Sequence, residues 1–139
     1  MKQLVLAAVM AFLVPNVALA QDDALAAGEQ VFKKCAACHA VGEGAKNKVG
    51  PVLNNVFGRT AGSLEDYKYS TAMVEAGKGG LVWTPETMAE FVKSPREFVK
   101  GTKMTFAGLK EEADVQNLIA YLLTFSPDYV PAEGEAAAQ

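Results

Sequence analysis

The stretch FKKCAACH, residues 32–39, decides how the rest of the chain is interpreted. It holds both cysteines and the only histidine among 139 residues. That scarcity excludes a framework of several disulfides, a Cys2His2 zinc finger and any site that needs two imidazoles. Chemistry that requires thiolate or imidazole ligands must therefore use Cys35, Cys38 and His39.

Several kinds of site contain a Cys-x-x-Cys pair. A disulfide is typical of an exported protein, and thioredoxin-like redox centres use the same spacing. Neither explains His39, no βαβ pattern adjoins the motif, and zinc would lack a fourth ligand nearby. Cys-x-x-Cys-His is the pattern of covalent c-type haem attachment, in which residues three and four apart share one face of a helical turn. We favour haem attachment, with disulfide or dithiol chemistry as the alternative.

The amino terminus has the pattern of a secretory signal. Lys2 is followed by an apolar run over residues 4–14 and by Ala18-Leu19-Ala20, a small-x-small cleavage signal. The apolar run is shorter than the roughly 20 residues that span a bilayer, although an uncleaved anchor is the alternative. We expect cleavage after Ala20, export to the periplasm, a functional domain over residues 21–126 and a disordered tail over residues 127–139.

The charge is unevenly distributed. Without residues 1–20 the chain keeps 12 basic and 16 acidic residues, which disfavours nucleic-acid binding. Residues 32–62 and 93–110 are nevertheless basic, while acidic residues gather near both ends of the chain. If the two basic segments meet in space, the molecule is a dipole with one basic face.

The periodicity predicts an all-α protein with long loops. One apolar stripe predicts a first helix that runs from about residue 25 into the cysteine motif. Four more helical segments are expected over residues 70–75, 85–93, 94–100 and 111–125. Gly77 is expected to stop the second segment, Thr84 to cap the third, and a capping box from Ser94 to Glu97 to start the fourth. So few helical residues bury a thin core, which a covalently held apolar group can complete.

An iron atom bound by His39 needs a second axial ligand if it is to transfer electrons without binding substrate, and methionine is the next choice. Met73 and Met88 lie in helical segments, where methionine is usually core filler. Met104 lies in a flexible-looking loop, far from His39 in sequence. Spacing therefore favours Met104 over the other two.

Several ordered blocks resemble class I c-type cytochromes, in particular the short bacterial ones similar to mitochondrial cytochrome c. The resemblance covers about residues 28–123. It rests on the cysteine motif together with Lys48-Val49-Gly50-Pro51, Phe57-Gly58-Arg59-Thr60-Ala61-Gly62, Trp83, Gly101-Thr102-Lys103-Met104-Thr105-Phe106-Ala107-Gly108 and Leu118-Ile119-Ala120-Tyr121-Leu122. It implies the class I cytochrome c fold, several short helices and long loops around one haem c bound covalently per chain.

The resemblance also implies roles for individual residues. His39 and Met104 would be the axial iron ligands, and the carbonyl of Pro51 would accept a hydrogen bond from the other nitrogen of His39. Further positions of the family pattern are Arg59, Tyr69 and Trp83, which would contact the haem propionates, and Thr102 in the distal pocket. Gly28 and Phe32 would pack against Leu118 and Tyr121, so that the first and last helices cross.

Three positions depart from the family pattern. Phe91 stands where a tyrosine often directs its hydroxyl at the methionine sulfur, Met73 stands where asparagine is common, and Asn55 replaces a usual glycine. Two polar members of the distal pocket are therefore missing. A drier pocket raises the reduction potential, whereas loss of a donor to the sulfur lowers it, and the sequence leaves the net effect open.

With both axial positions filled, the expected function is single-electron transfer between redox complexes of the respiratory or photosynthetic chain. The implied partners are acidic surfaces of a cytochrome bc complex, an oxidase, a reaction centre or a periplasmic dehydrogenase, and we expect a monomer without a membrane anchor. Candidate docking residues are Lys33, Lys34, Lys100, Lys103 and Lys110, although surface lysines also serve only as solvated charge. If Met104 were displaced from iron, a peroxidase or a gas-binding protein would be the alternative.

Overall fold

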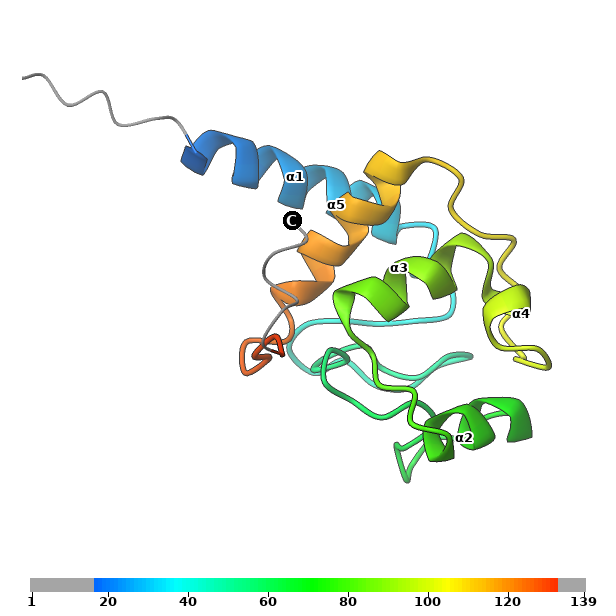
Figure 1. Ribbon diagram of the computed structural model, residues 1–139. Coiled ribbons are helices and arrows are strands. Elements are labelled where there is room, and N and C mark those ends of the chain that lie inside the picture. Colours follow the sequence, from blue (N-terminus) through cyan, green and yellow to red (C-terminus); the bar gives the residue numbers. More distant parts are fainter. Residues whose placement is uncertain (1–16, 133–139) are drawn as a thin grey trace, which may run out of the picture.

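The computed structural model describes residues 17–132, in which helices are joined by long irregular segments (Figure 1). The helices are α1 (Val17–Phe32), α2 (Thr71–Lys78), α3 (Pro85–Lys93), α4 (Pro95–Phe98) and α5 (Glu112–Leu123). In the described residues, β-structure is limited to an isolated antiparallel bridge between Thr60 and Val82. The all-α prediction is confirmed.

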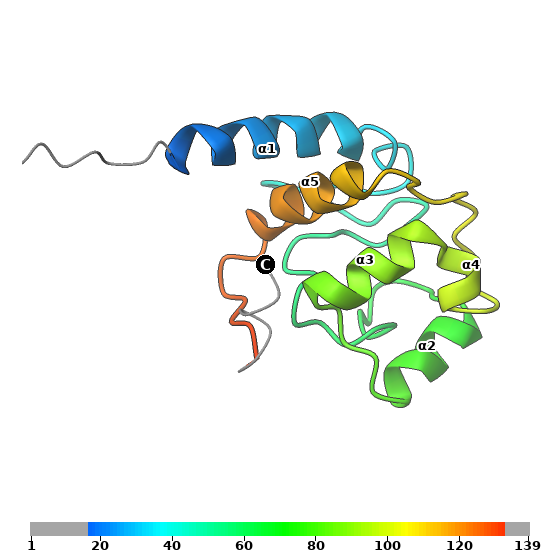
Figure 2. The ribbon, with the colours of Figure 1, turned by 45° about the horizontal axis from the view of Figure 1, so that its top comes forward.

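Helices α1 and α5 cross at a glycine, as the family resemblance implied. A Cβ on Gly28 would stand 2.1 Å from the carbonyl oxygen of Asn117 and 2.6 Å from Cβ of Tyr121. Only glycine therefore lets the two backbones approach this closely. One turn later the Phe32 ring lies 5.6 Å from the Tyr121 ring. Both views show α1 lying across α5, with α3 packed on the other side of α5 (Figures 1 and 2).

The buried face of α5 forms the centre of the core. Val115, Leu118 and Leu122 are 0%, 2% and 1% exposed, and they recur at the three- and four-residue spacing of one helix face. Lys34 forms an ion pair with Asp114 of α5 at 3.0 Å, which joins the cysteine motif to the start of that helix. The last helix thus supports the segment that carries the cysteines.

Helix α2 corrects one expectation. Ser70 caps it by accepting a hydrogen bond from the Met73 N–H, but Gly77 lies inside the helix and Gly79 is its C-cap. A Cβ on Gly77 would stand 1.8 Å from the carbonyl oxygen of Ala61, so this glycine serves close packing instead of chain termination. Sequence alone does not distinguish these two uses of glycine.

The caps of α3 and α4 differ in how well the sequence predicted them. Thr84 caps α3 and Pro85 begins it, as expected for the third segment; Thr87 completes a reciprocal capping box that sequence reasoning missed. Ser94 makes no side-chain cap hydrogen bond to α4, so the predicted capping box with Glu97 is wrong. The chain turns there through the backbone, because the Glu97 and Phe98 N–H groups both donate to the Ser94 carbonyl.

The ends of the described chain bear on the predicted domain limits. Residues 1–16 of the predicted signal lie outside the described residues, and α1 begins at Val17, so cleavage after Ala20 stays a prediction. No helix in the described part is long and apolar enough to cross a membrane. The Tyr129 ring lies 5.7 Å from the Phe57 ring, so the packed chain continues beyond the expected limit at residue 126.

Candidate functional site

A cavity of about 290 Å³ opens between the cysteine motif, the loops and the helices. Most of its walls are apolar, and almost every site residue expected from the sequence lines it. These lining residues include Cys35, Cys38, His39, Pro51, Arg59, Tyr69, Trp83, Thr102 and Met104, with Lys34 and Lys103 at the same cavity. Segments more than 60 residues apart in sequence therefore form one site.

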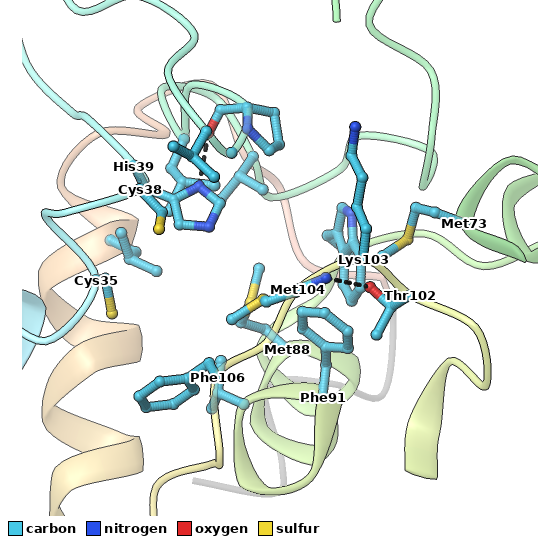
Figure 3. Close-up of a pocket in the computed structure, with 18 of the residues that line it drawn as sticks. Cys35, Cys38, His39, Met73, Met88, Phe91, Thr102, Lys103, Met104 and Phe106 are labelled. Atoms are coloured by element: carbon cyan, nitrogen blue, oxygen red, sulfur yellow. Dashed lines mark hydrogen bonds between the residues drawn. The ribbon is translucent and has the colours of Figure 1, made fainter. Parts of the chain in front are cut away.

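Backbone turns place the two thiols and the imidazole on one wall. The Cys35 N–H donates to the Phe32 carbonyl at 2.7 Å, and the Cys38 and His39 N–H groups both donate to the Cys35 carbonyl, at 3.0 and 2.9 Å. The chain thus continues in helical turns beyond α1, and Cys35, Cys38 and His39 face the cavity together (Figure 3).

Both cysteines are free thiols in the structure. Burial raises the pKa of Cys35 to about 11, against smaller opposing effects of Lys34. Redox-active dithiols depend on a thiol whose pKa is lowered, because the thiolate is the attacking species. The electrostatic surroundings of Cys35 therefore do not favour the dithiol alternative.

His39 is oriented by its neighbours. Its Nδ1 lies 2.8 Å from the Pro51 carbonyl oxygen, and because a carbonyl only accepts, Nδ1 carries the proton. Burial lowers the pKa of His39 more than this hydrogen bond raises it, so the ring is neutral near pH 7. A neutral ring protonated at Nδ1 presents an unprotonated Nε2, which is the form that ligates a metal. Figure 3 shows the second ring nitrogen on the cavity side.

Methionine lies across the cavity from this ring. Figure 3 shows Met104 opposite His39, and the Met104 N–H donates to Thr102 Oγ1 at 3.3 Å. Met73 and Met88 also line the cavity, from α2 and α3, where they are buried as core residues. The structure therefore brings three thioethers to one cavity, and only Met104 comes from a loop.

The loop that carries Met104 is fixed at both ends. Before it, the Thr102 N–H donates to the Val99 carbonyl at 3.0 Å, and after it the Leu109 N–H donates to the Val92 carbonyl at 2.8 Å. Gly108 has a φ of +110°, and a Cβ there would stand 2.0 Å from the Lys93 carbonyl oxygen. The loop is thus irregular but anchored.

Lys103 adds a further anchor within that loop. Its Nζ donates to the Lys68 carbonyl and lies 4.7 Å from the centre of the Tyr67 ring. The Tyr67 hydroxyl in turn donates to the Val49 carbonyl at 2.6 Å. The methionine loop is thereby linked to the segment beside His39. Sequence reasoning missed Tyr67, although its place two residues before Tyr69 is a signal.

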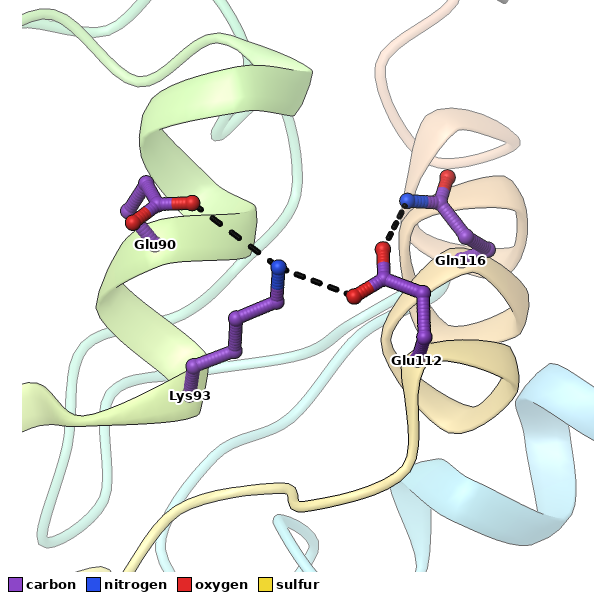
Figure 4. A network of polar contacts seen from close by, with 4 residues as sticks. All are labelled: Glu90, Lys93, Glu112 and Gln116. Atoms are coloured by element: carbon purple, nitrogen blue, oxygen red, sulfur yellow. Dashed lines mark hydrogen bonds and ion pairs between the residues drawn. The ribbon is translucent and has the colours of Figure 1, made fainter.

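A polar network at the surface joins α3 to α5, the two helices that contact the end of the methionine loop (Figure 4). Lys93 Nζ of α3 lies 2.9 Å from Glu112 Oε2 of α5 and 3.8 Å from Glu90 Oε1, and Gln116 donates to Glu112 at 2.8 Å. Glu112 raises the pKa of Lys93, while Gln116 and then Lys93 lower the pKa of Glu112. Because Glu90, Glu112 and Gln116 are exposed and Lys93 is only partly buried, the network orients α3 on α5 more than it stabilises the fold.

Arg59 stands in the cavity wall with its guanidinium held by backbone carbonyls. Nη1 donates to Val52 at 3.0 Å and Nη2 to Asn54 at 2.6 Å. Burial lowers the pKa of Arg59 and raises that of Tyr69, whose hydroxyl is a neighbour of the guanidinium. The structure thus brings together two of the three predicted propionate contacts. The third, Trp83, is buried with its ring 5.0 Å from that of Phe91.

Two of the departures from the family pattern have clear positions. Phe91 is buried in the cavity wall between Trp83 and Phe98, at ring distances of 5.0 and 6.2 Å. Asn55 has a φ of +54°, the one non-glycine residue of the described chain with a positive φ. That left-handed conformation explains why glycine suits this position, and asparagine tolerates it better than most residues.

The candidate docking lysines are exposed, but they differ in their partners. Lys34 is paired with Asp114 at 3.0 Å, and Lys33 Nζ donates to Gln30 at 2.6 Å. Lys110 Nζ donates to the Ala107 carbonyl at 3.2 Å. Sequence reasoning missed Val49, an apolar side chain that is 73% exposed and lines the cavity. Its position between Lys48 and Gly50-Pro51, with no periodic apolar neighbours, was the available signal.

Comparisons with known proteins agree with this geometry. The sequence model of a family described as "Cytochrome c" matches residues 25–126. Cytochrome c2 of Afifella marina is 56% identical over 109 residues, which cover 78% of this chain and 88% of that protein. Cytochrome c-550 of Ancylobacter novellus is 50% identical over 103 residues, covering 74% of this chain and 96% of that protein. The solved structure of cytochrome c2 from Rhodospirillum centenum has a TM-score of 0.71 and 41% identity, covering 74% of this chain and 98% of that one.

Proposed function

This chain belongs to the cytochrome c family, and from that premise we propose that Cys35 and Cys38 attach its haem while His39 and Met104 hold the iron. The protein is an electron carrier and not an enzyme, and it binds one covalent haem c through its Cys-x-x-Cys-His motif. When bound, the haem supplies a one-electron iron couple. The chain supplies attachment, axial ligands and the environment that tunes the couple.

One arrangement carries the assignment of these four residues. The two thiols and the imidazole lie on one wall of an apolar cavity, and Met104 faces them from the other side (Figure 3). The donor set fits haem c, because the thiols can form thioether bonds while the unprotonated Nε2 and the thioether are both suitable iron ligands. The Pro51 carbonyl fixes the orientation of His39, which would hold this ligand in place when the haem is bound.

The ligand set explains why this chain suits electron transfer. If His39 and Met104 both hold the iron, neither substrate nor oxygen would have an open coordination site. A methionine ligand also raises the reduction potential relative to a second histidine, which suits an acceptor of electrons from a quinol-oxidising complex. The apolar walls, among them Phe91, Met88 and Leu118, would keep water away from the bound haem iron.

The mouth of the cavity provides a docking surface in this proposal. Val49 offers exposed apolar area, and Lys103 and Lys100 add positive charge beside the methionine loop. Lys34 contributes less to steering, because Asp114 neutralises it. An acidic partner surface would be attracted to this face although the chain as a whole is acidic.

We also propose that the carrier is exported to the periplasm, with cleavage after Ala20, and that it works as a monomer. Its partners there would be a cytochrome bc complex, an oxidase, a reaction centre or a periplasmic dehydrogenase. The signal pattern of residues 1–20 supports export.

The attachment is tested by expressing the chain together with a haem-ligation apparatus. We expect a red protein whose pigment stays with the polypeptide in acidified organic solvent. Cys35→Ala would leave a single thioether bond and change the spectrum of the haem in alkaline pyridine. A colourless wild-type protein, or a pigment that extracts freely, would overturn the proposal.

A further inference from the structure

The chain after α5 makes an ordered set of contacts that have no part in the proposed haem attachment or iron ligation. Residues 125–129, here called the C-terminal strap, follow the helix end as a series of backbone turns. The Phe125, Ser126 and Tyr129 N–H groups donate to the carbonyls of Leu122, Leu123 and Ser126, each at 3.0 Å. Ser126 is only 4% exposed, so the strap enters the core instead of running over the surface.

The strap holds the turn formed by residues 54–59. The Asn55 N–H donates to the Phe125 carbonyl at 2.7 Å, and the buried Phe57 N–H donates to Ser126 Oγ at 3.3 Å. The Tyr129 ring lies 5.7 Å from the Phe57 ring. Backbone hydrogen bonds, a buried hydroxyl and an aromatic pair therefore join the two segments, although they are about 70 residues apart in sequence.

The strap also reaches the segment that follows His39. A Cβ on Gly42 would stand 3.9 Å from Phe125 Cε1, which is ordinary contact. Asn54 then binds the Gly42 backbone twice, because its side chain accepts from the Gly42 N–H and donates to the Gly42 carbonyl, both at 2.8 Å. The strap thus supports both halves of the loop on the histidine side of the cavity.

The supported turn contributes directly to the cavity wall. Val56 and Arg59 line the cavity, and Asn54 supplies one of the two carbonyls that hold the Arg59 guanidinium. The same turn pairs with Trp83, because Gly58 N–H donates to the Trp83 carbonyl at 2.8 Å and Trp83 N–H donates to the Arg59 carbonyl at 2.9 Å. Any movement of the turn moves Arg59 and Trp83 as well.

We propose that the C-terminal strap is a positioning element for the haem cavity, in which Ser126 and Tyr129 fix Val56, Arg59 and Trp83 through the turn of residues 54–59. This inference rests on the proposed function of the cavity. Loosening the strap lets water approach the wall and lets the Arg59 charge move away. Both changes favour the oxidised form, which carries the extra positive charge, so the reduction potential falls.

Two point variants of the holoprotein test the proposal without removing chain. Ser126→Ala removes the acceptor of a buried N–H, and Tyr129→Ala removes the ring that covers Phe57. We expect the Asn55 and Phe57 amides to exchange with solvent about tenfold faster in both variants, and the midpoint potential to fall. Val130→Ala, at an adjacent residue that is 83% exposed, is the matched control, and we expect it to keep the wild-type exchange rates and midpoint potential.

A conservative variant, Tyr129→Phe, completes the experiment. Tyr129→Phe keeps the ring against Phe57 and is expected to restore the wild-type midpoint potential. If Ser126→Ala and Tyr129→Ala hold covalent haem with the wild-type midpoint potential, the strap is only structural and the inference is wrong. Failure of the proposed function is a separate result, because it would be seen in the wild-type protein as a lack of covalent haem.

Discussion

Gly50 lies so close to His39 that a Cβ on its backbone would stand 2.4 Å from Cε1 of the imidazole and 2.8 Å from both ring nitrogens. The ring could withdraw from such a Cβ only by giving up the hydrogen bond between Nδ1 and the Pro51 carbonyl, which is 2.8 Å long. The Gly50 N–H is itself fixed to the Cys38 carbonyl at 2.7 Å. Two consecutive residues, Gly50 and Pro51, thus determine where the imidazole stands.

Gly50→Ala is therefore expected to destabilise the holoprotein by about 1–3 kcal/mol, the range for overpacking in a close-packed interior. The displaced imidazole should also shift the midpoint potential, measured by redox titration alongside thermal unfolding. Val49→Ala is the control, because that neighbouring side chain is 73% exposed and its removal should change stability by less than about 0.5 kcal/mol. Equal stability of the two variants would show that the ring is free to move.

Met104→Leu should abolish the charge-transfer band between methionine sulfur and ferric iron, and allow carbon monoxide to bind rapidly to the reduced protein. Leucine keeps the apolar volume but offers no ligand. The control is Met88→Leu, a buried and volume-conserving change in α3 that should retain the band and cost less than about 1.5 kcal/mol. Loss of the band in Met88→Leu, with retention in Met104→Leu, would assign the ligand to Met88.

Phe91→Tyr should shift the midpoint potential by more than about 20 mV, which is about a twofold change in a one-electron equilibrium constant. The new hydroxyl enters a buried site beside Trp83. If it donates to the methionine sulfur, it weakens the ligand and raises the potential, whereas added polarity alone lowers it. An unchanged midpoint potential would contradict the predicted shift, whether because residue 91 does not approach Met104 or because the two effects cancel.

Gly77→Ala should destabilise the protein by about 2 kcal/mol or more, because the new Cβ would collide with the Ala61 carbonyl oxygen at 1.8 Å. Gly79→Ala is a matched control at the end of the same helix. Its φ is −76°, and a Cβ there would meet nothing nearer than 3.4 Å. Chemical denaturation of both variants measures the difference, and similar midpoints of unfolding would contradict the close packing of α2 on residues 60–62.

Changing Lys33, Lys103 and Lys110 together to glutamate should lower the rate of electron transfer with a cytochrome bc complex about tenfold or more at low salt. Raising the ionic strength should bring the variant and wild-type rates together, because screening removes the steering that distinguishes them. Equal rates at low salt would show that these lysines serve only as solvated surface charge.

Local patterns gave much of this structure from the sequence. The cap at Thr84 and the start of α3 at Pro85 follow from short-range rules for helix ends. The crossing of α1 and α5 at Gly28 came instead from the resemblance to a known family, because it joins residues about 90 apart in sequence. The motif of Cys35, Cys38 and His39 predicted one shared face because helical spacing imposes it. The lining of the cavity by these residues agrees with that prediction.

Expectations were less accurate where one local pattern has two physical uses. A glycine near a helix end serves as a stop or as a point of contact, and at Gly77 the carbonyl of Ala61 decides between them. Ser94 and Glu97 have the spacing of a capping box, but the backbone of Ser94 turns without the side-chain hydrogen bond. Composition placed Tyr129 in the expected disordered tail, but its ring packs against the Phe57 ring.

The amino-acid sequence alone determined the chemistry that this chain can perform, because a single histidine, two cysteines and few methionines leave hardly any choice of ligands. Tertiary structure alone decided how the distant groups around these ligands meet, since only the folded chain brings Arg59 to two backbone carbonyls and Ser126 to Phe57. Ligand identity is a property of residue type. The environment of a ligand depends on distances between segments far apart in sequence, and those distances are set by packing.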